Sequence, residues 1–301
     1  MSGYRCNKLG FEENEKGIFK RNGKEHKLGH ILPDPDKNRE KNFLPCLIES
    51  SRGRNLQIDA HRWLYFGGQH ATEKLSSGFV QNRIKLHTYF HHLNSSQAMC
   101  LNFFYPLLET KQLKIILSFL SEEFNVDFNG EDIKYSTVRF EKPGLEIGYG
   151  YRPTSFDFYF QTTSGKKFYF EIKYTEVGCR DKNDKEHRNK FKKVYHNHLS
   201  SLEAKYHKAK DFLRYYQVMR NLVHIDKDSF VVFIYPSQNE AIADEMDIAK
   251  DALKENRKRH FFPIEWEEMV RYVEKDFSER ECPLFIQQFK EKYLDLNTDI
   301  P

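Results

Sequence analysis

The sequence predicts an α/β fold, and three observations along the chain predict it. Apolar residues first recur at helical spacing from Met99 to Leu120. The period then changes from about 3.6 to about 2 in segments rich in Phe, Tyr and Thr, which is typical of β-strands. A wholly apolar run, Phe230–Tyr235, follows a long charged segment and indicates an interior strand covered on both faces. Helices, a hairpin, a helix, a strand and further helices in this order indicate an α/β domain.

Two helices are predicted before the strands. Ser95-Ser96-Gln97 opens the first, because Ser is a preferred residue at a helix N-cap and apolar residues follow at helical spacing. Pro106 is expected to kink or end this helix near its last turn, since its ring replaces the backbone N–H. The second helix is predicted over residues 112–124, with its leucines and isoleucines on one face.

Strands are predicted at residues 135–140, 155–161 and 167–174. The last two are expected to form a hairpin, because their connection, residues 162–166, is short, polar and contains Gly. A long helical region is predicted from Arg188 to His224. The rest of the chain is assigned as a helix over 240–255, a strand over 259–264 and closing helices over 265–275 and 283–294.

Composition excludes several classes of protein. The chain has 301 residues, of which 39% are hydrophobic and 31% charged, so it is long enough for a sizeable core and is not a disordered polymer. No stretch approaches the roughly 20 apolar residues that span a bilayer, and the first residues lack the apolar core of a signal peptide. Five scattered cysteines with no CxxC spacing predict reduced thiols, a cytoplasmic location and no structural zinc.

Positive charge is concentrated in one segment. Between Arg180 and Arg220 there are twelve Lys and Arg against five Asp and Glu, with four His besides. Such a concentration is the electrostatic signature of a protein that binds nucleic-acid phosphates, although a long exposed helix of mixed charge looks similar. The candidates for phosphate contact are Lys190, Lys192, Lys193, Lys205 and Lys208. We interpret His187, His196 and His198 as a solvated face rather than metal ligands, because no Cys or carboxylate joins them at a recognised spacing.

The predicted hairpin carries the candidate catalytic residues. Alternation in the first strand puts Phe156, Phe158 and Phe160 on one face and Asp157 on the other. In the second strand, Glu171 and Lys173 share the face opposite the aromatic one. If the connecting loop is symmetric, Asp157 lies across from Glu171 with the two Cβ atoms roughly 5 Å apart.

Two carboxylates this close repel each other, but they can hold a divalent cation. Hard oxygen ligands favour magnesium or manganese, and a neighbouring Lys can orient a water. This arrangement suits phosphodiester hydrolysis, in which the metal neutralises charge on the transferring phosphate. The alternative is that Asp157, Glu171 and Lys173 form a solvated charged face of an ordinary hairpin.

These residues resemble the PD-(D/E)XK nuclease superfamily, whose signature is an acid on one strand and (D/E)-x-K on the next. Phe156 replaces the usual Pro before the acid, although Pro153 is near in sequence. The sequence of roughly residues 86–295 further resembles a bacterial branch of restriction endonucleases. The matching segments are Ser95-Ser-Gln-Ala98, Asn102-Phe-Phe-Tyr-Pro106, Glu171-Ile-Lys-Tyr-Thr-Glu176 and Gln217-Val-Met-Arg-Asn221.

The resemblance implies a restriction-endonuclease-like core with a mixed central sheet flanked by helices. It implies Asp157 and Glu171 as ligands of Mg²⁺, for which Mn²⁺ would substitute, and Lys173 as the catalytic lysine. The resemblance places Gln97 at a supporting position, with Glu109 and Glu146 as weaker candidates. Further supporting candidates are Glu176, beyond the second strand, and Gln217 with Arg220, which are three positions apart on one predicted helix face.

The sequence therefore predicts a magnesium-dependent DNA endonuclease, with a restriction or defence role implied by the resemblance. Two alternatives stay open: a protein on the same fold that binds nucleic acid or a partner without catalysis, and a nuclease specific for RNA or for a structure. Residues 86–301 are assigned to the nuclease-like domain. Residues 1–85 form an N-terminal extension of uncertain structure that would supply specificity or a dimer contact. A homodimer is expected if duplexes are cut, and a companion methyltransferase would be invisible in this sequence.

Overall fold

A computed structural model describes residues 12–13, 19–21, 24–26, 95–151, 154–176, 178, 182–278 and 284–294 of the chain. The chain divides into two compact units, one of residues 116–265 and the other of residues 1–115 and 266–301. Most of the predicted extension 1–85 lies outside the described residues. Within it, three short antiparallel strands are described: β1 (Glu12–Glu13), β2 (Phe19–Arg21) and β3 (Lys24–His26).

A five-stranded mixed sheet forms the centre of the unit 116–265, in the order β4-β5-β6-β7-β8. The first three strands are antiparallel to one another, and β6, β7 and β8 run parallel. Their bounds are Arg139–Pro143 (β4), Ser155–Gln161 (β5), Lys167–Ile172 (β6), Ser229–Tyr235 (β7) and Phe261–Glu265 (β8). The predicted α/β fold with a mixed sheet flanked by helices is therefore confirmed.

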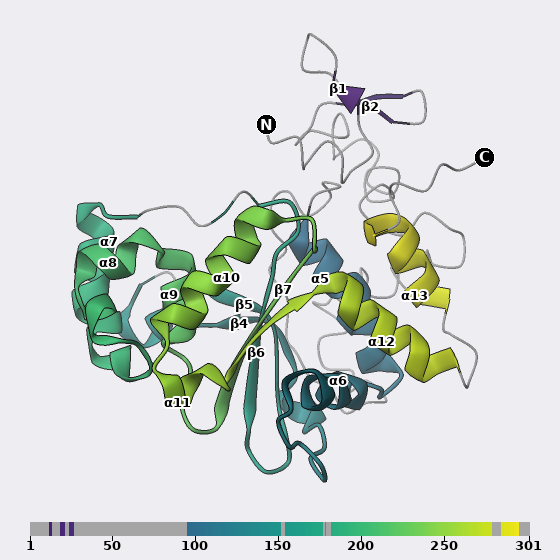
Figure 1. The fold of residues 1–301 in the computed structure, drawn as a ribbon, viewed down its shortest axis with the longest axis horizontal. Helices are drawn as coiled ribbons and strands as arrows, with labels where there is room; N and C mark the ends of the chain where they lie inside the picture. The colour runs from purple at the N-terminus through teal and green to yellow at the C-terminus, as the bar shows by residue number, and fades with distance from the viewer. Residues whose placement is uncertain are drawn as a thin grey trace. The chain divides into compact units, whose positions relative to one another are not determined.

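Helices of the same unit cover both faces of this sheet (Figure 1). On one face, Val231 and Phe233 of β7 pack into a core with residues of α8 (Ala209–Arg214), α9 (Tyr216–Leu222) and α10 (Glu240–Ala252). On the other face, Phe262 of β8 contacts Phe124 of α6 (Lys114–Phe124), with ring centroids 4.5 Å apart. Every residue of β7 is buried, as its unbroken apolar sequence predicts.

Aromatic packing also organises the helices of the other unit. These helices are α5 (Ser96–Glu109), α12 (Trp266–Ser278), α13 (Leu284–Phe289) and the π-helical turn Lys290–Leu294. Ser95 caps α5 as predicted, because its hydroxyl accepts a hydrogen bond from the backbone N–H of Ala98. Phe103 of α5 packs edge-on against Trp266, and α5 ends three residues after Pro106. No helix in the described part of the chain has the length and apolarity to cross a bilayer.

The predicted strand 135–140 and the predicted helix 188–224 differ most from the structure. Residues Tyr135–Thr137 form a 3₁₀ turn rather than a strand, and β4 begins only at Arg139. The region predicted as one helix from Arg188 to His224 is a series of short pieces: α7 (Lys185–Lys190), a π-helical turn Phe191–Tyr195, 3₁₀ turns His196–Ser201 and Ala204–His207, then α8 and α9.

Tertiary packing explains the breaks in that region. Leu202 is extended, with φ −95° and ψ 152°, and forms an isolated antiparallel bridge with Leu253. Large apolar residues on both sides of it enter the core that covers β7, which a single straight helix could not achieve because it buries one face only. Burial here overrides the helical propensity of the charged sequence.

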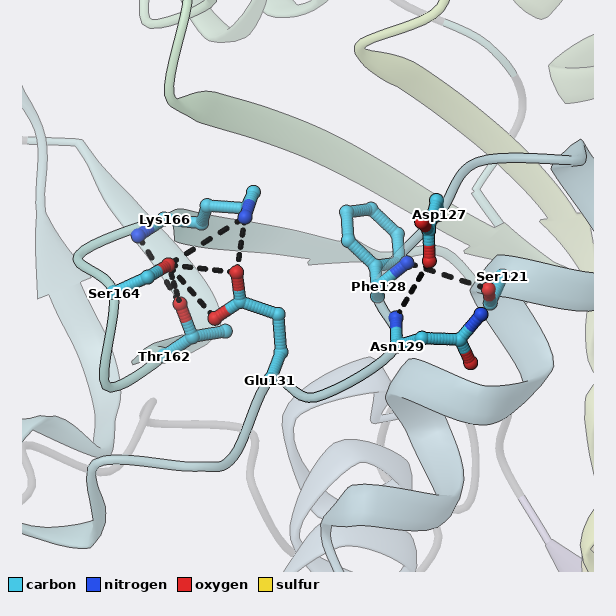
Figure 2. Close-up of polar contacts among 8 residues, drawn as sticks. All are labelled: Ser121, Asp127, Phe128, Asn129, Glu131, Thr162, Ser164 and Lys166. Atoms are coloured by element: carbon cyan, nitrogen blue, oxygen red, sulfur yellow. Dashed lines mark hydrogen bonds and ion pairs between the residues drawn. The ribbon is translucent and has the colours of Figure 1, made fainter.

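The hairpin between β5 and β6 is anchored at its tip by a buried carboxylate (Figure 2). Glu131, in the segment between α6 and β4, accepts hydrogen bonds from Ser164 and pairs with Lys166, both in the hairpin loop. Burial opposes ionisation of Glu131, but the hydrogen bonds from Lys166, Ser164 and Thr162 and the charge of Lys166 together outweigh it and lower the pKa of Glu131 from 4.5 to about 2. The loop that fixes the register of β5 and β6 is thus tied to the rest of the unit.

We expect Glu131→Gln to destabilise the protein by about 1 kcal/mol at pH 7, because a charged hydrogen-bond acceptor is lost. The effect is no larger because Lys166 is partly exposed and water screens the ion pair. The folded-state pKa of Glu131 is depressed, so its contribution is fully present above pH 4.5 and is lost as the pH falls toward about 2. Urea unfolding at several pH values measures this. A difference between wild type and variant that does not narrow below pH 4.5 would contradict it.

Candidate active site

The register of the β5–β6 hairpin brings the predicted site residues together. Phe158 pairs with Phe170 and Gln161 with Lys167, which is the predicted symmetric register. The pairing ends at Phe158 and Phe170, one pair short of Asp157 and Glu171. The two acidic residues therefore lie where β5 and β6 begin to diverge, rather than within a regular ladder.

The alternation of β5 breaks at Asp157. Phe158 contacts Phe140 and Phe170 on one face of the sheet. Phe156, predicted to share that face, instead packs against Tyr169 and His224, with ring centroids 4.9 and 4.8 Å away. The prediction for Phe156 is wrong because strand alternation holds only while the ladder is regular.

At this break, Asp157 bonds to the neighbouring strand through its side chain. Its Oδ2 accepts a hydrogen bond of 2.6 Å from the backbone N–H of Ile172. Ile172 stands between Glu171 and Lys173, so this bond fixes Asp157 beside both residues. The sequence Asp157 … Glu171-Ile172-Lys173 is thereby brought to one place.

Glu171 and Lys173 form a buried ion pair at the end of β6. Lys173 Nζ donates to Glu171 Oε1 at 2.7 Å, and the two residues are only 6% and 4% exposed. The backbone N–H of Lys173 donates to the carbonyl of Ile234 on β7, which holds the residue against the parallel part of the sheet. The solvated charged face considered from the sequence is therefore wrong for this pair.

The second carboxylate oxygen of Glu171 lacks a partner in the structure. Oε2 is buried and has no hydrogen-bond partner. A buried carboxylate oxygen without a partner costs free energy, because burial removes its water and nothing replaces it. This atom is thus available to a cation.

Negative charge accumulates around Asp157. Burial raises the pKa of Asp157 well above its usual range, and the charges of Glu171 and Glu141 raise it further, against the opposing effects of the Ile172 N–H and of Lys173. A carboxyl group in this setting gains from a bound cation, since the cation offsets both the burial and the repulsion.

Glu141 is a member of the acidic group that the sequence analysis missed. It lies between the pairs Phe140–Phe158 and Lys142–Phe156, at the position across from Asp157. Its φ of 52° is in the left-handed region, which is uncommon for a residue other than Gly and marks local backbone strain. The sequence signal was obscured because β4 was predicted to end at Phe140.

The donor set fits magnesium. Asp157 and Glu171 offer hard carboxylate oxygens, which magnesium prefers, and a protein commonly supplies only one or two of them while water completes the coordination. No ready-made cluster of three or more His, Cys, Asp or Glu ligands occurs among the described residues. Among the described residues, Asp157 and Glu171 therefore form a sparse set of oxygen ligands.

Arg220 connects the acidic residues with helix α9. Its Nη2 lies 4.0 Å from Glu171 Oε1, and its guanidinium stands over the ring of Tyr216 at 5.7 Å. Gln217 lines the same cavity as Arg220. The two residues predicted to share a helix face thus do face one cavity, even though the long helix around them does not exist.

A family model for restriction endonucleases associating with ARP matches residues 34–294. The chain belongs to this family. No curated protein and no solved structure matches the chain. The family match covers the whole sheet and every residue predicted for the site, from Gln97 to Arg220. Membership in a restriction-endonuclease family agrees with the nuclease class of function.

Within the family's matched region, Glu146 bonds through one carboxylate oxygen, while its Oε2, like that of Glu171, is buried without a hydrogen-bond partner. Glu146 is fully buried, and its Oε1 accepts hydrogen bonds from Thr154 at 2.5 Å and Tyr195 at 2.6 Å. Burial opposes its ionisation, but these two hydrogen bonds, a backbone hydrogen bond and the charge of Lys190 together lower the pKa of Glu146. Lys190 Nζ lies 3.5 Å away. Glu146 thus holds a lysine of the basic segment.

The other supporting candidates have local or separate positions. Glu176 Oε2 accepts a hydrogen bond from the backbone N–H of Tyr174, directly after the site. Gln97 and Glu109 lie at opposite ends of α5 in the other compact unit, and their roles stay predictions. Of the five lysines expected to contact phosphates, Lys190 lines a cavity, and the others are exposed: Lys192, Lys193, Lys205 and Lys208.

Proposed function

We propose that the protein is a magnesium-dependent nuclease that hydrolyses phosphodiester bonds of DNA, with a site of the PD-(D/E)XK type. The observation that carries the proposal is the buried, unpartnered Oε2 of Glu171, which lies in the same side chain as the ion pair with Lys173. Membership in a restriction-endonuclease family supports the same class of activity.

Asp157 and Glu171 would hold the Mg²⁺ ion, and Mn²⁺ would substitute for it. When bound, the metal ion neutralises charge on the transferring phosphate and makes a water more acidic. The protein's own contribution is to fix the two carboxyl groups: Asp157 through the Ile172 N–H, and Glu171 through Lys173. Neither carboxylate then needs to reorganise when the ion binds.

Lys173 is the proposed catalytic lysine. Its ammonium group is held at 2.7 Å from Glu171 Oε1 and is buried, so its charge is poorly screened by water. From there it can orient the attacking water or donate a hydrogen bond to a phosphate oxygen. Arg220 adds a second positive charge close to Glu171.

The wider setting of the activity rests on the family and on the sequence. We propose a restriction or defence role in the cytoplasm, in association with ARP as the family's description states. Cutting both strands of a duplex needs two active sites, so a homodimer is part of the proposal. A companion methyltransferase would protect the host's own DNA.

Cleavage assays over a panel of substrates test the function. Purified full-length protein is incubated with supercoiled plasmid, linear duplex, single-stranded DNA and RNA, each with Mg²⁺, Mn²⁺ or EDTA. We expect cleavage of DNA with either metal and none with EDTA. Cleavage of RNA alone would contradict the DNA substrate, and metal-independent binding without cleavage would favour a binding protein on the same fold.

A further inference from the structure

A cavity of about 300 Å³ opens beside the candidate active site. It lies within the unit 116–265, and the residues that define its chemistry are Tyr151, Lys182, His187, Lys190, Gln217 and Arg220. Its volume is at the lower end of the roughly 300–1,000 Å³ found for small-molecule pockets. The cavity is therefore larger than a single inorganic anion requires, since a water takes up only about 30 Å³.

Positive charge dominates the wall of the cavity. Lys182, Lys190 and Arg220 line it, against the single lining carboxylate of Glu186. The Nε atom of Arg220 is buried without a hydrogen-bond partner. Three cationic residues that line one confined space match the charge and the acceptor oxygens of a phosphate group.

Two of these cations, Lys190 and Arg220, are held in place by contacts with other residues. Lys190 lies 3.5 Å from the buried carboxylate of Glu146 and 5.9 Å from the centre of the Tyr216 ring. Arg220 lies over the same ring. Tyr216 in turn is hydrogen-bonded to Tyr195, which donates to Glu146. The network of Glu146, Tyr195 and Tyr216 therefore orders both cations before any ligand arrives.

Arg220 links the cavity to the proposed site of hydrolysis. Arg220 lines it and also lies 4.0 Å from Glu171. Thr154, another lining residue, immediately precedes the strand that carries Asp157. A group bound in the cavity would thus be a close neighbour of the reacting phosphodiester.

We propose that this cavity binds one nucleotide of the substrate, adjacent to the bond that is cut. Its phosphate lies among Lys182, Lys190 and Arg220, and the remaining volume beside Tyr151 takes its sugar and base. This inference deepens the proposed function and rests on it for the identity of the substrate. Glu146, which is fully buried and lies 3.5 Å from Lys190 Nζ, is a positioning residue for Lys190.

Binding of a free nucleotide in EDTA tests the proposal without needing cleavage. Deoxyadenosine 5′-monophosphate is titrated into the full-length protein and followed by calorimetry and ligand-observed NMR. We expect saturable binding at one site, weakened about tenfold or more by Lys190→Met, because a charged hydrogen bond is lost. Lys210→Met removes the same charge from an exposed position on α8 outside the cavity and is expected to leave the affinity within about twofold.

Two further ligands separate a nucleotide site from a general anion site. Deoxyadenosine, which lacks the phosphate, is expected not to bind, and inorganic phosphate is expected to bind at least about tenfold more weakly than the nucleotide. Equal affinity for phosphate and nucleotide, or an equal loss in Lys210→Met, would overturn the proposal. If Lys190→Met fails to fold, the double variant Lys190→Met/Glu146→Gln removes both charges, and it is expected to show the same weakening.

Because these titrations contain no metal, their outcome is independent of the proposed hydrolysis. Nucleotide binding with no cleavage of any substrate would support the nucleotide site and contradict the proposed nuclease activity. Cleavage without nucleotide binding would support the nuclease activity and contradict the nucleotide site.

Discussion

Lys173→Met is expected to lower the rate of DNA cleavage by about 10²–10⁴-fold, the range typical of a lost group that moves or orients a proton in the transition state. Met keeps much of the apolar stem of Lys and removes the ammonium group that contacts Glu171. The measurement is the rate of plasmid nicking under single-turnover conditions with Mg²⁺. Chemistry rather than product release is then observed.

The same substitution leaves Glu171 buried without its partner, which is destabilising on the order of 3–5 kcal/mol. Folding therefore has to be checked by circular dichroism and thermal melting, and Lys173→Gln, which retains a hydrogen-bond donor, serves as a second variant. Lys167→Met is the matched control, because Lys167 begins the same strand at its far end. Full activity of Lys173→Met or Lys173→Gln would remove Lys173 from the mechanism.

Asp157→Asn is expected to have two opposite effects. Cleavage should fall at least about 10²-fold, since a neutral amide is a poorer ligand for magnesium than a carboxylate. The metal-free protein should become more stable, because the repulsion of Asp157 by Glu171 and Glu141 and the cost of burying its charge both disappear. Asn can still accept the hydrogen bond from Ile172. A gain of about 1 kcal/mol corresponds to a rise in Tm of about 2–4 °C.

Thermal melting with and without Mg²⁺ measures the stability effect. We expect Mg²⁺ to raise the Tm of wild type and to have little effect on Asp157→Asn, because a ligand stabilises only a fold that binds it. Gln161→Glu, a change of charge on the same strand away from the site, controls for general effects on β5. A variant that is both less stable and fully active would show that Asp157 has a structural role only.

The hairpin shows how much of this site the sequence can predict. Alternation of Phe and Tyr identified β5 and β6, and the Gly-containing loop gave the register of Phe158 with Phe170. Local chemistry is sufficient here because a short loop leaves few alternative pairings. The proximity of Asp157 to the Glu171-Ile172-Lys173 segment followed from that register.

What the sequence could not predict depends on contacts between distant residues. The bridge of Leu202 with Leu253, which helps to break the predicted long helix, joins residues 51 positions apart in the chain. The loss of alternation at Phe156 follows from its packing against Tyr169 and His224. Glu141 lies across from Asp157 because β4 continues past Phe140, with Glu141 itself in a strained backbone conformation.

In the proposed mechanism, Asp157 and Glu171 together hold the divalent ion that hydrolysis requires. Crystals of the full-length protein soaked in Mn²⁺ test this most directly, because the anomalous signal of manganese locates the ion without reference to activity. We predict an anomalous peak within coordination distance, about 2–2.3 Å, of the carboxylate oxygens of both residues. Crystals that bind Mn²⁺ only elsewhere, while the same preparation cleaves DNA, would contradict the account.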